Sequence, residues 1–448
     1  MSYIALSDND KREMLARVGV REPAELFGCI PEGVRLTKLL DLPPAMPEPE
    51  LDRHMTAVAA KNTYGDFLSF LGAGVYDHFI PSIVDSLSSR TEFVTPYTPY
   101  QPEVAQGTLQ AIFEYQTLIC QLTGLDVSNA SLYDGAHAAA EAVLMIHRLT
   151  GRKRVLVARS LHPQYRETIL TYTRNVGLVV EEVGYGSCGG LKSAELREKM
   201  GDDVAGLLVQ SPNFFGVVED LKACADAVHA RKGLLAAVTA EALSLGLLEA
   251  PGKLGADIAC GEAQSFGLPP AFGGPYLGFM ASAKEHMRQL PGRIAGQTKD
   301  VDGRRGFVLT LSTREQHIRR EKATSNICSN QAWCALRATM FLETLGREGL
   351  REMALQNVHK ARYAADALTR LPGVTVRFSG SFFNEFVLDL PKDAAAVAAA
   401  LKAKGILGGL PLGGFEPGAE KALLVAVTEV QTKACIDRLA AALEEVLR

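Results

Sequence analysis

The amino-acid sequence predicts an α/β protein with a mainly parallel, doubly wound sheet, an N-terminal arm and a small C-terminal α+β domain. Two observations predict the sheet: short runs rich in β-branched residues recur between residues 154 and 281, and helical patterns lie between several of them. A third observation is a long Ala/Leu-rich helical pattern near residue 330, followed by a second, shorter set of strands and helices. Strands that alternate with helices form parallel sheets that helices cover on both faces.

The chain length predicts more than one domain. A chain of 448 residues is longer than a single hydrophobic core usually holds. We therefore expect an N-terminal helix and extended arm over residues 1–60, a large domain over 61–325 and a small α+β domain over 326–448. The apolar share of 47% and the charged share of 22% are ordinary for a globular protein.

Charge and cysteine content exclude several classes of function. A net charge of -4 provides no field that attracts nucleic acid or an anionic membrane, so neither is an expected partner. The eight cysteines form no CxxC pair and show no zinc-ligand spacing with histidine, so we expect reduced cysteines and no metal site. The N-terminus is polar and acidic, and no apolar run reaches the length of a membrane span. We expect a soluble, cytoplasmic protein.

The arm begins with a short helix. Residues 8–18 have apolar positions at helical spacing behind the capping candidates Ser7 and Asp8. The proline-rich stretch 42–49 cannot continue a helix and predicts an extended segment. Two roles remain open for this segment, a wrap around a neighbouring subunit and a simple linker.

The strands and helices of the two domains follow from their residue patterns. In the large domain we expect strands at 154–158, 178–183, 204–210, 234–238, 257–260 and 276–281, with helices at 135–149 and 220–231. In the C-terminal part we expect a long helix at 330–345. It is followed by strands at 374–378, 384–390 and 423–428 and by helices at 394–404 and 432–446.

The start of the helix at 135–149 is the first candidate site. Asp134 and Gly135 form a turn, and Ala136 and His137 begin a helix of small residues. Such a helix N-terminus leaves amides open to an anion such as a cofactor phosphate, and His137 could stack on an aromatic ring. A capped helix packed tightly against the sheet explains the same residues, so both interpretations stay open.

Polar residues also follow several strands. His162 lies beyond the strand at 154–158, and Gln264 and Ser265 lie beyond the strand at 257–260. Open α/β sheets bind ligands at this edge, beyond the carboxyl ends of their strands. Taken one at a time, each of these segments is also an ordinary loop.

Several of these segments together resemble the aminotransferase-type, fold type I pyridoxal-phosphate enzymes. More specifically, the chain resembles the first subunit of the two-subunit form of the glycine cleavage system P-protein family. The resemblance extends over essentially the whole chain, and the run TREQHIRREKATSNIC at 313–328 is its most specific part. The segments that carry the resemblance are residues 93–103, 131–141, 255–265, 313–328 and 382–386.

The resemblance also shows what this chain lacks. Enzymes of this fold hold pyridoxal phosphate as a Schiff base on a lysine, and an acid keeps the ring nitrogen protonated. At the position of the lysine this chain has Ser265, and at the position of the acid it has Val238. A hydroxyl cannot form the imine, and valine cannot protonate the ring. The resemblance therefore implies no catalytic residue in this chain, and a vestigial cofactor pocket at Asp134, Gly135, Ala136, His137, His162 and Gln264.

The family's activity implies the partners. A homologous second subunit would bind the pyridoxal phosphate, in a heterodimer and then an α2β2 assembly. Together the subunits would decarboxylate glycine and pass the aminomethyl group to the lipoylated H-protein, as glycine dehydrogenase (decarboxylating). This chain alone would be inactive but could complete the pocket at the interface. The candidates for that role are Tyr97, Thr98, Pro99, Tyr100, Gln101, Arg314, His317 and Arg319.

Alternatives remain at this point. The loop at 97–101 could be a rigid turn packed against the partner, and the segment at 314–320 could be a salt-bridged interface helix. The whole chain could be a structural or regulatory pseudoenzyme. A self-sufficient pyridoxal-phosphate lyase or aminotransferase would need a lysine where Ser265 stands, since Lys253, Lys284 and Lys322 have the pattern of surface residues.

Overall fold

The computed structural model describes residues 5–36, 38–96 and 99–448 and divides into two compact units, 1–64 and 65–448. In the first unit, α1 (Asp8–Val18) is capped by Ser7, one of the two predicted capping candidates. The Ser7 hydroxyl accepts a hydrogen bond from the Asp10 amide in a capping box. The second helix, α2 (Glu48–Ala59), was not predicted. The proline-rich stretch is irregular only as far as Pro47, because Pro49 occupies the first turn of α2, where its missing N–H costs nothing.

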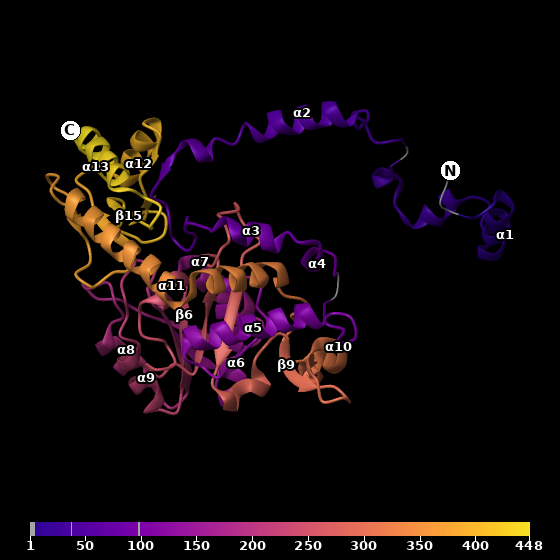
Figure 1. The fold of residues 1–448 in the computed structure, drawn as a ribbon, viewed down its shortest axis with the longest axis horizontal. Helices are drawn as coiled ribbons and strands as arrows, with labels where there is room; N and C mark the ends of the chain where they lie inside the picture. The colour runs from indigo at the N-terminus through magenta and orange to yellow at the C-terminus, as the bar shows by residue number, and fades with distance from the viewer. Residues whose placement is uncertain (1–4, 37, 97–98) are drawn as a thin grey trace. The chain divides into compact units, whose positions relative to one another are not determined.

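The second unit is built on a seven-stranded sheet with the order β2-β8-β7-β6-β5-β3-β4. Figure 1 shows this unit, with β6 of the sheet labelled. The strands β3 to β7 are parallel, whereas β8 runs antiparallel to both β7 and β2. The prediction of a mainly parallel sheet is confirmed, and each of its six predicted strands is present to within two residues. The strands are β2 (Val127–Ser128), β3 (Arg154–Ala158), β4 (Val179–Val183), β5 (Val204–Gln210), β6 (Leu234–Thr239), β7 (Ile258–Glu262) and β8 (Gly278–Ser282).

Helices cover both faces of this sheet because successive strand residues point to opposite sides. Val155 and Val157 of β3 pack with α6 (Gly135–Thr150) in one core cluster. Leu156 packs on the other face with residues of α8 (Ser193–Lys199) and α9 (Leu221–His229). The sheet is therefore doubly wound, as predicted.

Two further helices bury the part of the sheet around β7 and β8. Side chains from α5 (Gln106–Thr123) and α11 (Ala332–Leu368) form a third core cluster with Phe279 of β8. The prediction at 330–345 identified the first half of α11. The helix continues beyond Gly346, whose φ of 60° and ψ of -175° mark a kink between two helical halves.

The remaining elements of the large region were mostly not predicted from the sequence. An antiparallel hairpin of β9 (Ile294–Lys299) and β10 (Arg305–Thr310) packs near α5. The other elements there are α3 (Ser82–Ser88), α4 (Thr91–Val94), α7 (Pro163–Thr173) and α10 (Gln316–Arg319), with 3-10 turns η3 (Tyr64–Asp66), η4 (Ala242–Gly246), η5 (Lys284–Gln289), η6 (Ser312–Arg314) and η7 (Arg320–Lys322). Two more 3-10 turns, η1 (Pro23–Cys29) and η2 (Glu32–Val34), lie in the first unit.

The C-terminal part forms a four-stranded sheet with the order β11-β12-β15-β14, as an α+β arrangement requires. A separate short strand, β1 (Leu68–Ser69), pairs in parallel with β13 (Ile406–Leu407). The chain just after β1 therefore starts beside the small sheet and continues toward the large one. The elements of this part are β11 (Thr375–Val376), β12 (Glu385–Asp389), α12 (Ala394–Ala403), β14 (Leu410–Pro411), β15 (Ala422–Ala426) and α13 (Lys433–Leu447).

Candidate functional site

At the start of α6, where we predicted a phosphate site, backbone amides are bonded to side chains of the protein. Asp134 caps the helix and accepts a hydrogen bond from the His137 amide at 2.8 Å. The Gly135 amide, which we expected to be open, donates to Oε2 of Glu262 at 3.0 Å. The other oxygen of Glu262 accepts from the Leu277 amide at 2.8 Å. A carboxylate at the end of β7 therefore occupies the place where the helix would meet an anion.

This position is also crowded and buried. A Cβ atom on Gly135 would lie 2.2 Å from the Tyr165 hydroxyl oxygen, so only glycine fits there. Burial raises the pKa of Glu262 to about 7, although the amides of Leu277 and Gly135 hydrogen-bond to its charged form. A phosphate dianion at the same amide would clash with this carboxylate and repel it.

His137 and Ala136 belong to the packing of α6. The His137 ring lies 4.7 Å from the Tyr133 ring and 5.7 Å from the Tyr172 ring, measured between centroids. Its Nε2 is 3.8 Å from a Glu141 oxygen, and burial lowers the pKa of the histidine. Ala136 packs against the core cluster on the same face of the sheet as α6.

His162 and Gln264 lie under the chain segment 73–78. The His162 ring packs against the Phe214 and Tyr165 rings, and its Nε2 is 2.9 Å from the carbonyl oxygen of Ala73. The Gln264 side chain accepts from the Tyr76 amide and donates to the Tyr76 carbonyl, both at 3.0 Å. These polar side chains at the strand ends therefore form hydrogen bonds with backbone groups of the segment 73–78.

Ser265 and Val238 stand at the two positions that the resemblance assigns to the amine and the acid of the cofactor chemistry. Ser265 is only 1% exposed, and its hydroxyl oxygen has no hydrogen-bond partner in the described part of the chain. Val238 is fully buried in the apolar core beneath α6. With the helix start filled by Glu262 as well, the residues present do not fit pyridoxal phosphate.

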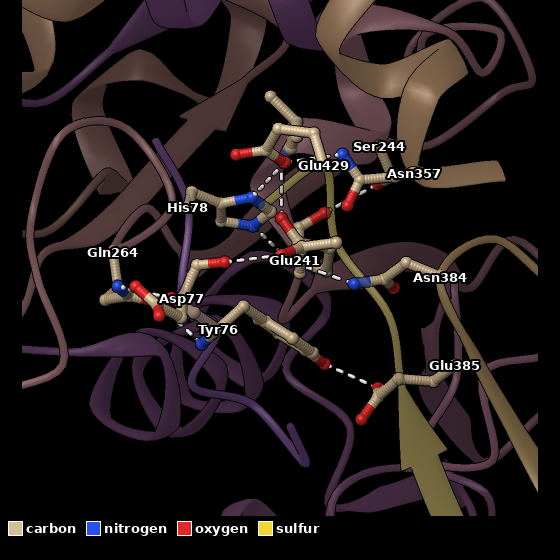
Figure 2. A network of polar contacts seen from close by, with 12 residues as sticks. Tyr76, Asp77, His78, Glu241, Ser244, Gln264, Asn357, Asn384, Glu385 and Glu429 are labelled. Atoms are coloured by element: carbon tan, nitrogen blue, oxygen red, sulfur yellow. Dashed lines mark hydrogen bonds and ion pairs between the residues drawn. The ribbon is translucent and has the colours of Figure 1, made fainter. Parts of the chain in front are cut away.

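A buried network of charges joins segments that are far apart in the sequence (Figure 2). His78 lies between two carboxylates, with Nε2 3.0 Å from Glu241 and Nδ1 2.8 Å from Glu429. Burial lowers the pKa of His78, but the charges and hydrogen bonds of both glutamates outweigh this and raise it to about 10. His78 is therefore an imidazolium ion at neutral pH.

The same network extends to the small sheet. The Tyr76 hydroxyl donates to Glu385 of β12 at 2.6 Å (Figure 2). The Ala73 amide donates to the other Glu385 oxygen at 2.6 Å. Asn357 of α11 donates to Glu429 at 2.8 Å. We call residues Tyr76, His78, Glu241, Glu385 and Glu429 the junction cluster, because they link the chain after β6, the small sheet and the segment at 73–78.

A separate pocket of about 750 Å³ lies on the large region, and Pro99 and Tyr100 line it. Tyr97 and Thr98 lie outside the described residues. Gln101 is exposed, and its carbonyl accepts the amides of Val104 and Ala105. We call this cavity the Tyr100 pocket; it is also lined by Phe93, Val94, Pro96, Thr108, Ala111, Ile112, Arg293, Cys328, Ser329, Asn330, Ala332, Trp333, Ala335 and Leu336.

The sequence did not single out the polar residues around Tyr100. The Tyr100 hydroxyl donates to Oδ1 of Asn330 at 2.7 Å, and the Arg293 guanidinium lies 3.8 Å from the centre of the Tyr100 ring. Arg293 also donates to the Cys328 carbonyl at 3.0 Å. Asn330 lies two residues before α11, and this position near the start of a long helix was the one available sequence signal.

The structure does not bring Arg314, His317 and Arg319 to the Tyr100 pocket. The Arg314 guanidinium donates to the carbonyls of Leu290, Leu311 and Gly292, so it holds loops in place, and burial lowers its pKa. His317 and Arg319 are exposed on α10.

Neither a metal site nor a membrane span is found within the described residues. No set of three or more His, Cys, Asp or Glu side chains there is arranged to hold a metal ion. No helix there has both the length and the apolar character that crossing a membrane requires.

The fold of this chain is that of the fold type I pyridoxal-phosphate enzymes. Sphingosine-1-phosphate lyase from Burkholderia pseudomallei superposes with a TM-score of 0.68, covering 93% of this chain and 94% of that one at 16% identity. Glutamate decarboxylase from Lactobacillus brevis gives a TM-score of 0.67 at 14% identity, with 94% and 97% covered. At these identities the likeness concerns the fold alone.

The particular family follows from closer relatives. Residues 1–443 match the model of the glycine cleavage system P-protein family, and the chain belongs to this family. The probable glycine dehydrogenase (decarboxylating) subunit 1 of Moorella thermoacetica is 52% identical over 448 residues, 100% of both chains. Its counterpart from Geobacillus kaustophilus is 52% identical, with 97% of both covered. A crystal structure of an inhibitor-bound glycine decarboxylase P-protein has 45% identity and a TM-score of 0.88, with 100% of both chains covered.

Glu262 is bonded to the Gly135 amide, where we expected a cofactor phosphate. We therefore predict that one substitution cannot restore cofactor binding. Ser265→Lys should form no covalent adduct with pyridoxal phosphate, because Glu262 and Val238 still occupy the other two positions. Borohydride reduction followed by peptide mass spectrometry measures this, with Ser265→Ala as the control and circular dichroism to verify folding. A reduced adduct at position 265 in folded protein would contradict our interpretation of the site.

The junction cluster predicts a dependence of stability on pH. Because the pKa of His78 is raised from about 6.5 in the unfolded chain to about 10 in the folded one, its stabilisation is complete below pH 6.5. That stabilisation is then lost as the pH rises through 10. His78→Gln should lower the free energy of unfolding at pH 7 by about 3 kcal/mol, since two buried carboxylates lose their cation. The difference from wild type should shrink toward pH 10 by up to about 1.4 kcal/mol per pH unit.

Urea unfolding at a series of pH values measures this difference. His229→Gln is the matched control, because His229 also pairs with a carboxylate, Asp257 at 2.8 Å, but its side chain is 40% exposed. We expect the control to change stability by less than about 1 kcal/mol. A His78→Gln effect that is the same at every pH would show that packing, and not the charge of His78, explains it.

Proposed function

We propose that this chain acts as subunit 1 of a split glycine dehydrogenase (decarboxylating) whose homologous second subunit holds the pyridoxal phosphate. The single observation that carries this proposal is the filled cofactor face: the Gly135 amide is bonded to Glu262, and a buried hydroxyl stands at position 265. A chain of this family that keeps the fold but lacks a place for the cofactor needs a second chain that has one.

The reaction proposed for the assembled enzyme is the decarboxylation of glycine and the transfer of its aminomethyl group to the lipoylated H-protein. The lipoyl disulfide is the electron acceptor in this transfer. The cofactor chemistry belongs to the second subunit, so the contribution of this chain is to bind, orient and shield the reactants. We place the reaction in the cytoplasm, in keeping with eight unpaired cysteines.

The Tyr100 pocket is our candidate for that contribution. Its walls are mostly apolar, and a few polar groups converge within it, which is the usual composition of a small-molecule site. The Arg293 guanidinium lies 3.4 Å from Glu315 and could form charge-assisted hydrogen bonds with a second, small carboxylate such as that of glycine. The contacts of Tyr100 with Asn330 and Arg293 would hold both side chains in fixed positions.

The first unit is our candidate for binding the second subunit. None of the residues of α1 or α2 is buried, and α2 exposes Leu51, Met55 and Val58 at helical spacing. Leu39 is 95% exposed. Apolar side chains on a helix gain stability when a partner removes them from water, so we propose that this arm contacts the partner in an α2β2 assembly.

The proposal predicts a clear result for the separated subunits. The purified chain alone should neither bind pyridoxal phosphate covalently nor exchange labelled carbon dioxide with the carboxyl group of glycine. Addition of the second subunit should restore both activities, because that subunit supplies the amine. Exchange activity of this chain alone would overturn the proposal.

Tyr100→Phe tests the pocket in the reconstituted complex. The substitution removes the hydrogen bond from the Tyr100 hydroxyl to Asn330, so turnover should fall about tenfold without weaker assembly. Tyr363→Phe is the control, since it removes a hydroxyl that bonds exposed Asp437 outside this pocket. Steady-state kinetics and analytical ultracentrifugation measure the two effects, and wild-type turnover of Tyr100→Phe would remove the pocket from the active site.

A further inference from the structure

A second cavity on the large region is lined by cations and shares no lining residue with the Tyr100 pocket. Its volume is about 310 Å³, at the lower end of the range of about 300–1,000 Å³ for small-molecule sites. We call it the basic pocket. Its charged lining residues are Arg148, Arg288, Arg314, Arg319 and Lys322.

The fold brings these cations together from three parts of the chain. Arg148 lies in the last turn of α6, and Arg288 lies in η5. The other three come from the segment 311–324, which contains η6, α10 and η7. Like charges that converge in this way repel one another, so the arrangement costs stability unless something neutralises it.

The described protein neutralises these cations only in part, because the charge of Glu141 acts on Arg148 and that of Glu315 acts on Arg314. None of them forms an ion pair with a carboxylate among the described residues. Glu141, the nearest acid to Arg148, accepts a hydrogen bond from Ser325 at 2.6 Å. Glu315, beside Arg314, lies 3.4 Å from Arg293. Glu315 therefore holds another cation, whereas Glu141 is bonded to a neutral hydroxyl and its Oε2 has no hydrogen-bond partner among the described residues.

The two inner arginines are also removed from water. Arg148 donates to the Gln289 carbonyl at 3.2 Å, but its Nε is buried and has no partner among the described residues. Arg314 has only backbone carbonyls as partners. Burial lowers the pKa of both arginines, so each pays the cost of a partly desolvated charge. A ligand with several negative oxygens would offset this cost.

We propose that the basic pocket binds a small phosphate-bearing anion. Arginine forks match the oxygens of a phosphate group, and Lys322 adds a point charge. The hydroxyls of Thr313 and Thr324, which also line the pocket, supply neutral donors. The bound anion joins the segment 311–324 to α6 and η5. This site is independent of glycine decarboxylation and of the second subunit.

Calorimetric titration of the full chain with inorganic phosphate, in chloride buffer of low ionic strength, tests the proposal. We expect saturable binding near one equivalent and a rise in the thermal unfolding midpoint with phosphate. The double variant Arg288→Gln with Arg319→Gln should bind about tenfold more weakly, since it loses two charge-assisted contacts at exposed positions. Pyrophosphate is titrated in parallel, and tighter binding than phosphate assigns the pocket to a diphosphate group.

The matched control removes the same net charge beside the pocket. It combines Lys284→Gln with Arg320→Gln, two exposed residues that do not line the cavity. Its affinity for phosphate should stay within about twofold of wild type. Equal weakening in both double variants would show unspecific attraction to a basic surface and overturn the proposal. So would the absence of saturable binding, or its loss when the second subunit is added, since a partner carboxylate would then be the occupant.

Discussion

The first free amide of α6 meets a carboxylate from the chain itself, and the character of the cofactor face follows from that contact. The N-terminal end of a helix favours negative charge, and enzymes of this fold place a cofactor phosphate there. Glu262 satisfies the Gly135 amide internally, under the hydroxyl of Tyr165. The helix start is therefore stable without a cofactor, and the chain can keep the fold of its family while leaving the cofactor chemistry to another subunit.

The junction cluster holds in place the chain segment that covers the carboxyl ends of the strands. A cation between two buried carboxylates is stable only while the whole set is present, because each member compensates the desolvation of the others. His78 is held in this way by Glu241 and Glu429. The segment that carries it lies over His162 and Gln264. We infer that this chain does not bind the cofactor itself, and that it contributes to catalysis through the Tyr100 pocket.

Local sequence patterns predicted most strands of the large sheet but missed several of the connections between them. The β-branched runs predicted β3 and β5 with the observed bounds, since buried parallel strands need continuous apolar residues. The hairpin of β9 and β10 was missed because its strands are partly exposed and lack a continuous apolar run. The antiparallel direction of β8 was not visible either, because the direction of a strand depends on the connection before it and not on its residues.

The sequence by itself determined which side chains stand at the two positions on which our proposal depends. The side chains at positions 265 and 238 are a hydroxyl and an isopropyl group in any conformation. Only the tertiary structure decided which groups the start of α6 and the segment 73–78 bond to, because the contacts join residues far apart in the chain. Gly135 and Glu262 are 127 positions apart, and His78 and Glu429 are 351 apart. Such contacts depend on how strands and helices pack, and no local pattern of residues specifies them.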